Sequence, residues 1–337
     1  MSNLYSKIEQ NLISRFCNFR KTVAKNLSLI ILATIDCGSF STHQIATSIS
    51  KITNTAFHNG ENRLANFLKN DTFRVEDKAF RNLINIVFDL LGKRGFLDDL
   101  NYLPINVDFT SERDNFLILS ASIPFFGRSL PIYFSMRNYP KIKNQFSQKK
   151  MEEAFFLRLR HILPKKFEYI VVMDRGFGNP RILDLMDRFN FNYVVRFKES
   201  TKVEFGIEQI QASELPNISN KYTNITLKTD PQKTPRNLTI SFSKDKNLKQ
   251  GWFLVSNLAF EQIQNIYKNR FQIEKTFQDQ KSSGFNIEKT KITDYSKFKK
   301  LLYCTYLAQN ILLFLGEYIS ENVDTIKKKS AGILQNI

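Results

Sequence analysis

A continuous apolar run that ends in an acid constrains the fold of this chain more than any other feature. Residues 169–173, Tyr-Ile-Val-Val-Met, have the composition of a strand buried on both faces of a sheet, and Asp174 follows directly. Asn179 can cap a helix that has Pro180 in its first turn, and a further strand is predicted over 192–197. Strand, helix and strand form a right-handed crossover unit, and α/β sheets place chemistry at the carboxyl ends of such strands. The alternative is an Asp that only starts a turn.

Three more strands are predicted before this unit. They cover residues 104–110, 116–121 and 130–134, with a turn around 126–128. Sequential strands with short connections form an antiparallel meander, and the first of these strands carries Asp108. A helix is predicted to follow over 151–161.

The flanking parts of the chain differ in character. Residues 1–98 read as helical, and two short helices at 41–49 and 62–69 suit a helix-turn-helix-like DNA reader, although such pairs also occur in all-α bundles. Residues 199–250 contain runs that alternate at period two, which predicts a β-rich insertion. The last predicted elements are a strand at 252–257, whose first residue Trp252 is expected in the core, and a long helix at 295–319.

The stretch between this strand and the long helix predicts a helix with one buried face. It contains no Gly or Pro, and apolar side chains recur at Ile266, Ile273 and Phe277. At about 100° per residue, four polar residues fall within an arc of roughly 60° beside this face: Tyr267, Arg270, Glu274 and Lys281. The simpler interpretation is an ion pair at i,i+4 on a solvated helix face.

Charge and composition indicate the class of partner. The chain of 337 residues is 42% hydrophobic and 24% charged, as expected of a globular protein with two or three domains. Its formal net charge is +17, and its pI is near 9.6. Such an excess of positive charge points to a polyanion, with nucleic acid as the first candidate and an anionic membrane surface as the second.

Cysteine and histidine usage argues against a zinc site. The three cysteines (Cys17, Cys37, Cys304) and three histidines (His43, His58, His161) are scattered without metal-ligand spacing, and the thiols read as buried groups in a reducing compartment. The first residues lack the pattern of a signal peptide, and the apolar stretches at 27–35 and 301–315 are shorter than the roughly 18 residues that a spanning helix needs. We therefore expect a cytoplasmic protein that does not enter a membrane.

Three acids from distant parts of the chain are predicted to meet at one edge of the mixed sheet. They are Asp108 in the meander, Asp174 in the crossover unit and Glu274 on the helix. Carboxylates with no His or Cys nearby form a hard oxygen site that suits Mg²⁺ or Mn²⁺. Two such ions, roughly 4 Å apart, can activate a water or a 3′-hydroxyl beside a phosphodiester and stabilise the leaving oxygen.

Spacing and context together resemble a known family, the bacterial insertion-sequence transposases of the DDE class. Their subgroup with a Y-x2-R-x3-E-x6-K signature is matched by Tyr267, Arg270, Glu274 and Lys281. Asp108 lies in a V-D-x-T run and Asp174 in a D-R-G-F turn, and a Phe-Leu-Val-Ser-Asn-Leu strand comes shortly before the signature. The resemblance extends from about residue 101 to 315.

The resemblance implies a fold and a set of roles. It implies an α/β fold: an RNase H-like mixed sheet with flanking helices, a β-rich insertion and a helical N-terminal domain. Asp108, Asp174 and Glu274 would be the catalytic residues and would ligate two Mg²⁺ or Mn²⁺ ions. Phosphates of the DNA would be held by four residues: Tyr267, Arg270, Lys281 and, as a further candidate, Arg175, which could equally form a structural ion pair.

The resemblance and the sequence pattern together predict five regions. They are a helical DNA-binding region at 1–98, two parts of the catalytic core at 99–198 and 251–294, the insertion at 199–250, and a C-terminal helical region at 295–337 that takes part in dimer contacts. The expected partners are double-stranded DNA, both terminal inverted repeats and target DNA, and a second copy of the chain. The expected location is the bacterial cytoplasm, in association with the nucleoid.

The predicted function is cut-and-paste DNA transposition. The enzyme would hydrolyse a phosphodiester at each transposon end and transfer the freed 3′-hydroxyl into target DNA. A second hypothesis is a catalytically silent regulator derived from a transposase, which binds DNA and leaves it intact. A third, a general nuclease of the same fold, accounts less well for the helical N-terminal region and the insertion.

Overall fold

The computed structural model describes residues 2–98, 100–112, 115–138, 147–205, 208–215, 219–243, 251–258 and 263–334. The chain forms two compact units. A helical unit comprises Met1–Leu97, Leu130–Ile132 and Gln278–Ile337, and a sheet unit comprises Asp98–Ser129 and Tyr133–Phe277. The five regions predicted from the sequence stay a prediction, and two of their boundaries, at residues 99 and 250, lie outside the described residues.

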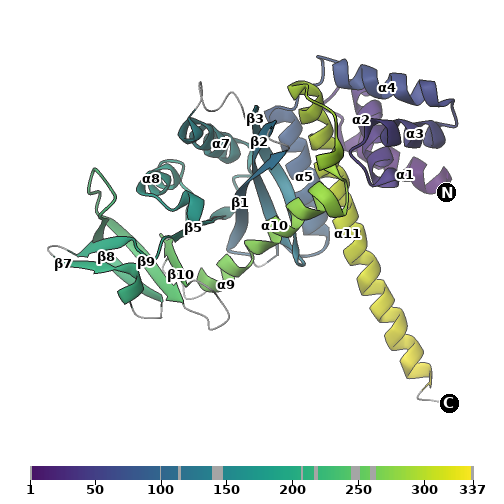
Figure 1. Ribbon diagram of the computed structural model, residues 1–337. Coiled ribbons are helices and arrows are strands. Elements are labelled where there is room, and N and C mark those ends of the chain that lie inside the picture. Colours follow the sequence, from purple (N-terminus) through teal and green to yellow (C-terminus); the bar gives the residue numbers. More distant parts are fainter. Residues whose placement is uncertain are drawn as a thin grey trace. The chain divides into compact units, whose positions relative to one another are not determined.

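The helical unit contains the helices predicted in the first part of the chain (Figure 1). Its main helices are α1 (Ser2–Arg15), α2 (Lys21–Cys37), α3 (Thr42–Thr53), α4 (Phe57–Lys69), α5 (Asp77–Lys93) and α11 (Tyr295–Leu334). Two short segments, η3 (Asp279–Ser283) and η4 (Ile287–Lys289), precede α11. Apolar side chains of α2 such as Leu27 and Ile30 are fully buried, and the buried Tyr303 hydroxyl of α11 donates to the Ala79 carbonyl at 2.9 Å.

The sheet unit contains all ten strands found among the described residues. They are β1 (Tyr102–Glu112), β2 (Phe116–Phe125), β3 (Arg128–Asn138), β4 (Glu168–Met173), β5 (Asn192–Phe197), β6 (Lys202–Phe205), β7 (Glu208–Gln211), β8 (Ser219–Leu227), β9 (Arg236–Ser243) and β10 (Trp252–Ser256). Their order in the sheet is β3-β2-β1-β4-β5-β10-β9-β8-β6-β7. The three residues Leu130–Ile132 of β3 group with the helical unit.

The pairing of the strands confirms the predicted meander and crossover. β1 and β2 are antiparallel, whereas β1, β4 and β5 are parallel to one another. β10 pairs antiparallel with both β5 and β9, so the insertion strands extend the same sheet. This large mixed sheet with flanking helices is consistent with the RNase H-like core that the family resemblance implies.

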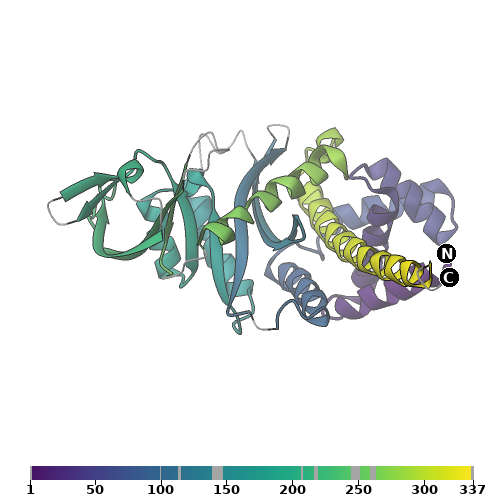
Figure 2. The ribbon, with the colours of Figure 1, turned by 90° about the horizontal axis from the view of Figure 1, so that it is seen from below.

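Helices cover both faces of the sheet. On one face lie α7 (Gln148–Ile162) and α8 (Pro180–Arg188), and on the other lie α9 (Ile263–Lys268) and α10 (Phe271–Gln278) (Figures 1 and 2). Strand residues alternate between these faces. Phe109 of β1 stacks on Phe177, which lies between β4 and α8, whereas Asn106 donates a hydrogen bond to the Asn269 carbonyl between α9 and α10. Asp108, two residues from Asn106, therefore faces α10.

The sequence predicted that the cysteines are buried and that the apolar stretches are too short to span a membrane. Cys304 is buried as expected, but Cys17 is exposed because it lies past the end of α1, and Cys37 is half-buried. No single helix among the described residues is long and apolar enough to cross a membrane. α2 and α3, which are bent by 108° at their junction, meet the length and composition criteria only as a pair.

Candidate active site

Two of the three predicted acids lie side by side on adjacent parallel strands. The register pairs Val107 of β1 with Met173 of β4, so Asp108 and Asp174 occupy the next position on each strand. Residues at matched positions of a sheet share a face, and Asn106 shows that this face is the one α10 covers. The strand pairing alone therefore brings together carboxylates that are 66 positions apart in the sequence.

Asp174 lies where β4 ends and the chain turns. Its Oδ1 accepts a hydrogen bond from the Gly176 backbone N–H at 2.9 Å, which caps the short 3₁₀ turn η1 (Arg175–Phe177). Asn179 then caps α8 by accepting from the Ile182 N–H at 3.2 Å, with Pro180 at the start of the helix. The predicted cap and helix start are confirmed, and Asp174 is also the turn-starting acid of the alternative interpretation.

The helix that carries the third acid is interrupted, which corrects the sequence prediction. Instead of one helix through Tyr267–Lys281, α9 ends at Lys268 and α10 begins at Phe271. The Asn269 carbonyl accepts a hydrogen bond from Asn106 Nδ2 at 2.9 Å, and the backbone closes with i to i−3 bonds across this point. The break turns Arg270 inward, so that only 4% of it is exposed. A side chain predicted at the rim of a helix is instead buried on the sheet.

Arg270 joins acids from two elements. Its Nη2 lies 2.6 Å from Glu274 Oε1 on α10, and its Nη1 lies 3.3 Å from Asp108 Oδ2 on β1. Its guanidinium also lies over the rings of Phe271 and Tyr267, at 4.5 Å and 5.6 Å from their centroids. The predicted ion pair at i,i+4 is therefore present, with its Arg270 end buried against the sheet and its Glu274 end exposed to solvent.

The surroundings of Asp108 change the pKa of its carboxyl group. Burial, followed by the negative charge of Asp174, raises the pKa of Asp108 to about 7, although Arg270 acts in the opposite direction. Glu274 adds a smaller contribution that also raises this pKa, which shows that all three acids lie within interaction range. Burial opposes the charge of Arg270, yet Tyr267, Glu274 and Asp108 raise the pKa of its guanidinium above the ordinary value. The cluster therefore places two further acids near Asp108, whose ion-pair partner is the guanidinium of Arg270.

Two hydrogen bonds from α10 to the sheet fix the position of Glu274. Gln272 accepts from the Phe125 N–H at 2.9 Å, and the buried Thr276 hydroxyl accepts from the Ser129 N–H at 2.7 Å. These residues flank Glu274 along the helix, four positions apart. The sequence prediction did not identify them, since polar residues on an amphipathic helix carry no signal of which backbone group they meet.

Tyr267 is part of the core and not of the surface. It is fully buried in a cluster with Ile170, Val172 and Trp252, and burial raises the pKa of its hydroxyl. Its ring packs edge-on against Trp252 with centroids 5.2 Å apart. The expectation that Trp252 lies in the core is confirmed, but a direct contact of Tyr267 with DNA would need this packing to open.

The other predicted phosphate contacts lie in different places. Arg175 is exposed in η1, directly beside Asp174. Lys281 is half-buried in the π-helical segment η3, which belongs to the helical unit. The DNA-binding roles of both residues stay predictions.

Arg196 is a candidate that sequence reasoning did not select. It lies on β5, where the register pairs Val172 with Val194, so Arg196 falls opposite Asp174 on the same face. Its Nη2 donates to the Gly251 carbonyl at 3.2 Å. Asp108, Asp174 and Arg196 thus form a row across three neighbouring strands. The available signal was the single charge in the apolar run Tyr-Val-Val-Arg-Phe, two positions beyond Val194.

The donor set suits a hard divalent cation, although the arrangement differs from a preformed metal centre. Three carboxylates without a His or Cys are the kind of ligand set that Mg²⁺ or Mn²⁺ prefers, and the charge of Asp174 is among the causes that raise the pKa of Asp108. Over the described ranges, however, no three His, Cys, Asp or Glu side chains are close enough to hold an ion together. Arg270 lies between Asp108 and Glu274.

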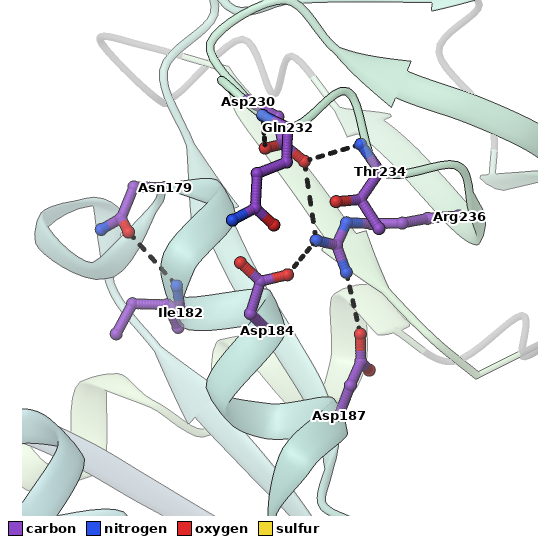
Figure 3. Close-up of polar contacts among 8 residues, drawn as sticks. All are labelled: Asn179, Ile182, Asp184, Asp187, Asp230, Gln232, Thr234 and Arg236. Atoms are coloured by element: carbon purple, nitrogen blue, oxygen red, sulfur yellow. Dashed lines mark hydrogen bonds and ion pairs between the residues drawn. The ribbon is translucent and has the colours of Figure 1, made fainter.

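A second buried arginine in the sheet unit gathers three other acids (Figure 3). Arg236 of β9 pairs with Asp184 and Asp187 on α8 and lies 3.7 Å from Asp230. Asp230 is 3% exposed and also accepts from the backbone N–H groups of Gln232 and Thr234. This cluster fastens the insertion to α8, and no sequence motif marked it.

Comparison with known proteins adds one finding. The family model described as the transposase DDE domain matches residues 145–311, slightly less than half of the chain. The matched stretch contains Asp174, Glu274 and the remaining signature residues but begins after Asp108. The match supports a DDE transposase family and implies an enzyme of the nuclease or transposase type. No curated protein matches the chain.

Proposed function

We propose that this protein is a cut-and-paste DNA transposase of the subgroup with the Y-x2-R-x3-E-x6-K signature. It hydrolyses a phosphodiester at each end of the element and then joins the freed 3′-hydroxyl to target DNA by in-line transesterification. The observation that carries the proposal is geometric: Asp108 and Asp174 lie at matched positions of neighbouring parallel strands, and Arg270 joins Asp108 to Glu274 of α10. The match to the transposase DDE domain supports it independently.

In this proposal the three carboxylates hold two Mg²⁺ or Mn²⁺ ions. A bound divalent ion supplies Lewis-acid stabilisation of phosphate charge and a nucleophilic oxygen at neutral pH. Arg270 orients Asp108 and Glu274 through its two ion pairs. Guanidinium groups also bind phosphate through paired hydrogen bonds, so Arg270, Arg175 and Arg196 are the residues that we expect to contact the DNA backbone near the scissile bond.

The proposed partners are the terminal inverted repeats, a target duplex and a second copy of the chain. The excess of positive charge supports a DNA partner. A second copy is proposed because the two ends of the element have to be held together before their joint transfer into the target. Tyr267 and Lys281 remain in the proposal as contacts made in the DNA complex, and for Tyr267 this requires the core around Trp252 to rearrange.

A strand-transfer assay tests the proposal. The full chain is incubated with labelled duplexes that carry the element's ends, a supercoiled target and Mg²⁺. We expect nicked ends and joined products with the natural sequence, and neither with Asp108→Asn, Asp174→Asn or Glu274→Gln. Activity at the natural level in any one variant removes that residue from the site.

A second function is favoured by one observation, the position of Arg270. A guanidinium between two of the three acids can replace a metal ion as the compensating charge, as expected of a catalytically silent regulator that only binds DNA. The same assay separates the two functions. A regulator shifts the end duplex in a gel and leaves every strand intact at all Mg²⁺ concentrations.

A further inference from the structure

Helix α4 presents an exposed face made of residues that can read DNA bases. Its buried stripe consists of Gly60, Leu64, Phe67 and Leu68, at most 5% exposed for the apolar three. The opposite face exposes His58, Asn59, Asn62, Arg63 and Asn66. Three amides, one imidazole and one guanidinium at successive turns form an unusual surface, since the exposed faces of most helices are rich in Lys and Glu.

The packing of α4 on α3 fixes which face is presented. A Cβ at Gly60 would lie 2.4 Å from the Ala46 carbonyl oxygen and 2.3 Å from Ser50 Oγ, so α4 and α3 are in close contact at a position that has no room for a side chain. The Ser50 hydroxyl also donates to the Ala56 carbonyl at 3.2 Å, in the short turn between the helices. α4 therefore cannot rotate without a clash, and its amide face is held outward.

The side chains on this face have the chemistry of base readout. Asn forms paired hydrogen bonds with the N6 and N7 atoms of adenine, and Arg with the O6 and N7 atoms of guanine. Asn62 Nδ2 lies 2.8 Å from His58 Nε2, so that this amide is already oriented along the helix. An α-helix also fits the width of the major groove, and α4 has one acid, Glu61.

The charge around α4 favours the phosphate backbone. Residues 1–97 hold 13 Lys and Arg against 7 Asp and Glu. Lys51 near the end of α3 and Lys69 at the end of α4 are both exposed, in positions suited to the strands that border a groove. α3 itself is a weaker candidate, because most of its length is buried and only its first residues and Lys51 are exposed.

We propose that α4 is the recognition helix of this protein and reads the major groove of a specific duplex. Asn62 and Arg63 contact base edges, and Lys51 and Lys69 contact phosphates. The inference rests on the proposed function, because it takes the element's own end sequence to be the duplex that is read. The exposed polar face and its fixed orientation support it without reference to the acids of the sheet unit.

Selection from a random duplex pool tests the proposal. The full chain is used in EDTA, so that binding is measured without cleavage, and its enriched sequences are compared with those of Asn62→Ala and Arg63→Ala. Each variant is expected to lose preference at one or two base positions, with discrimination falling roughly ten-fold or more. Asn85→Ala, the same change at an exposed position of α5, is the matched control and should enrich the natural consensus.

A second measurement separates base contacts from phosphate contacts. Lys51→Ala is expected to weaken binding to all sequences equally and to reduce the slope of log affinity against log salt by about one, with the consensus unchanged. Circular dichroism checks that each variant is folded. All of these side chains are exposed, so no loss of structure is expected.

The outcomes distinguish the recognition helix from the proposed enzyme. An unchanged consensus in both α4 variants, or a natural chain that enriches no sequence, overturns the inference even if strand transfer is observed. A consensus that depends on Asn62 and Arg63, in a protein that never cuts its preferred duplex, supports the inference and removes the transposase activity instead.

Discussion

Two buried arginines in the sheet unit are each surrounded by acids, and the two clusters differ in the partners of their most buried acid. Arg270 faces Asp108 and Glu274 on the sheet surface that α10 covers, whereas Arg236 joins three aspartates between α8 and the insertion. Around Arg236 the most buried acid, Asp230, receives two further backbone hydrogen bonds. Around Arg270 the most buried acid, Asp108, lies beside another carboxylate, and its pKa is raised to about 7.

The two clusters differ in how far partners compensate the charge of the most buried acid. Burial of a charge is tolerated when partners satisfy it, as at Asp230, and such a cluster stabilises structure. At Asp108 burial and repulsion are only partly offset by Arg270, and strongly perturbed acids of this kind concentrate at functional sites. The difference supports the proposal that the Arg270 cluster is the catalytic one, whereas the contacts of Arg236 join the insertion to α8.

The largest expected effect separates the two clusters by activity. Asp108→Asn, Asp174→Asn and Glu274→Gln should each lower the rate of end cleavage by roughly 10³-fold, because each removes a ligand or charge from the reacting phosphate. Asp184→Asn makes the same chemical change in the Arg236 cluster and should keep the rate within about three-fold. Cleavage of labelled end duplexes under single-turnover conditions gives both numbers. Equal losses in the two clusters would contradict the assignment.

The second prediction concerns stability, for which the larger effect is expected in the Arg236 cluster. Arg236→Met leaves the 3%-exposed Asp230 without its cation, and loss of one partner from a buried pair costs about 3–5 kcal/mol of unfolding free energy. Arg270→Met should cost less, since the acid that it pairs most closely, Glu274, has a side chain that is 52% exposed and can be solvated. Urea denaturation in EDTA measures both. A larger loss for Arg270→Met would mean that the Arg270 cluster is the structural one.

The sequence predicted one of these clusters and not the other, for a physical reason. Asp108 and Asp174 follow apolar runs whose strand pairing is dictated by burial, so their meeting at matched positions could be anticipated. The Arg236 cluster depends on where the turn around Asp230 meets the surface of α8, and nothing in the local pattern of either segment fixes that contact. The packing of the insertion on α8 depends on side chains whose spacing in the sequence follows neither a helical nor a strand period.

The break between α9 and α10 could not be anticipated for a similar reason. The segment has no Gly or Pro and good helical periodicity, so local preference favours a continuous helix. The competing interaction comes from Asn106, 163 residues earlier, whose amide binds the Asn269 carbonyl. The break coincides with the burial of Arg270 on the sheet, and Tyr267, which lies in α9 before the break, is buried against Trp252.

The third prediction compares one acid from each cluster. Asp230→Asn should destabilise the protein by about 1–3 kcal/mol, because it weakens two hydrogen bonds and one ion pair of a buried group. Asp108→Asn should instead stabilise the metal-free protein at pH 8 by about 1 kcal/mol, since it removes a carboxylate that burial and Asp174 disfavour.

The pH dependence of that gain has a definite sign. The folded-state pKa of Asp108 is raised from 3.8 to about 7, so the natural protein loses stability from this group as the pH rises between these values, and Asn at this position does not. The advantage of Asp108→Asn should therefore be full above pH 7 and vanish below about pH 4. Melting temperatures across this range, in EDTA, check the sign. A destabilised Asp108→Asn protein at pH 8 would show that Arg270 more than compensates the charge.

The smallest expected effect is the stabilisation by a divalent ion. If the acids around Arg270 bind Mg²⁺ or Mn²⁺, an ion concentration three times the dissociation constant adds about 0.8 kcal/mol to the unfolding free energy by mass action. The shift should disappear in Glu274→Gln, which changes the acid paired with Arg270. It should persist in Asp187→Asn, which changes an acid paired with Arg236. Because both clusters contain acids around one arginine, an unspecific effect of the ion on surface carboxylates would shift the two variants alike. Only a difference between the shifts of the two variants assigns the ion to the acids around Arg270.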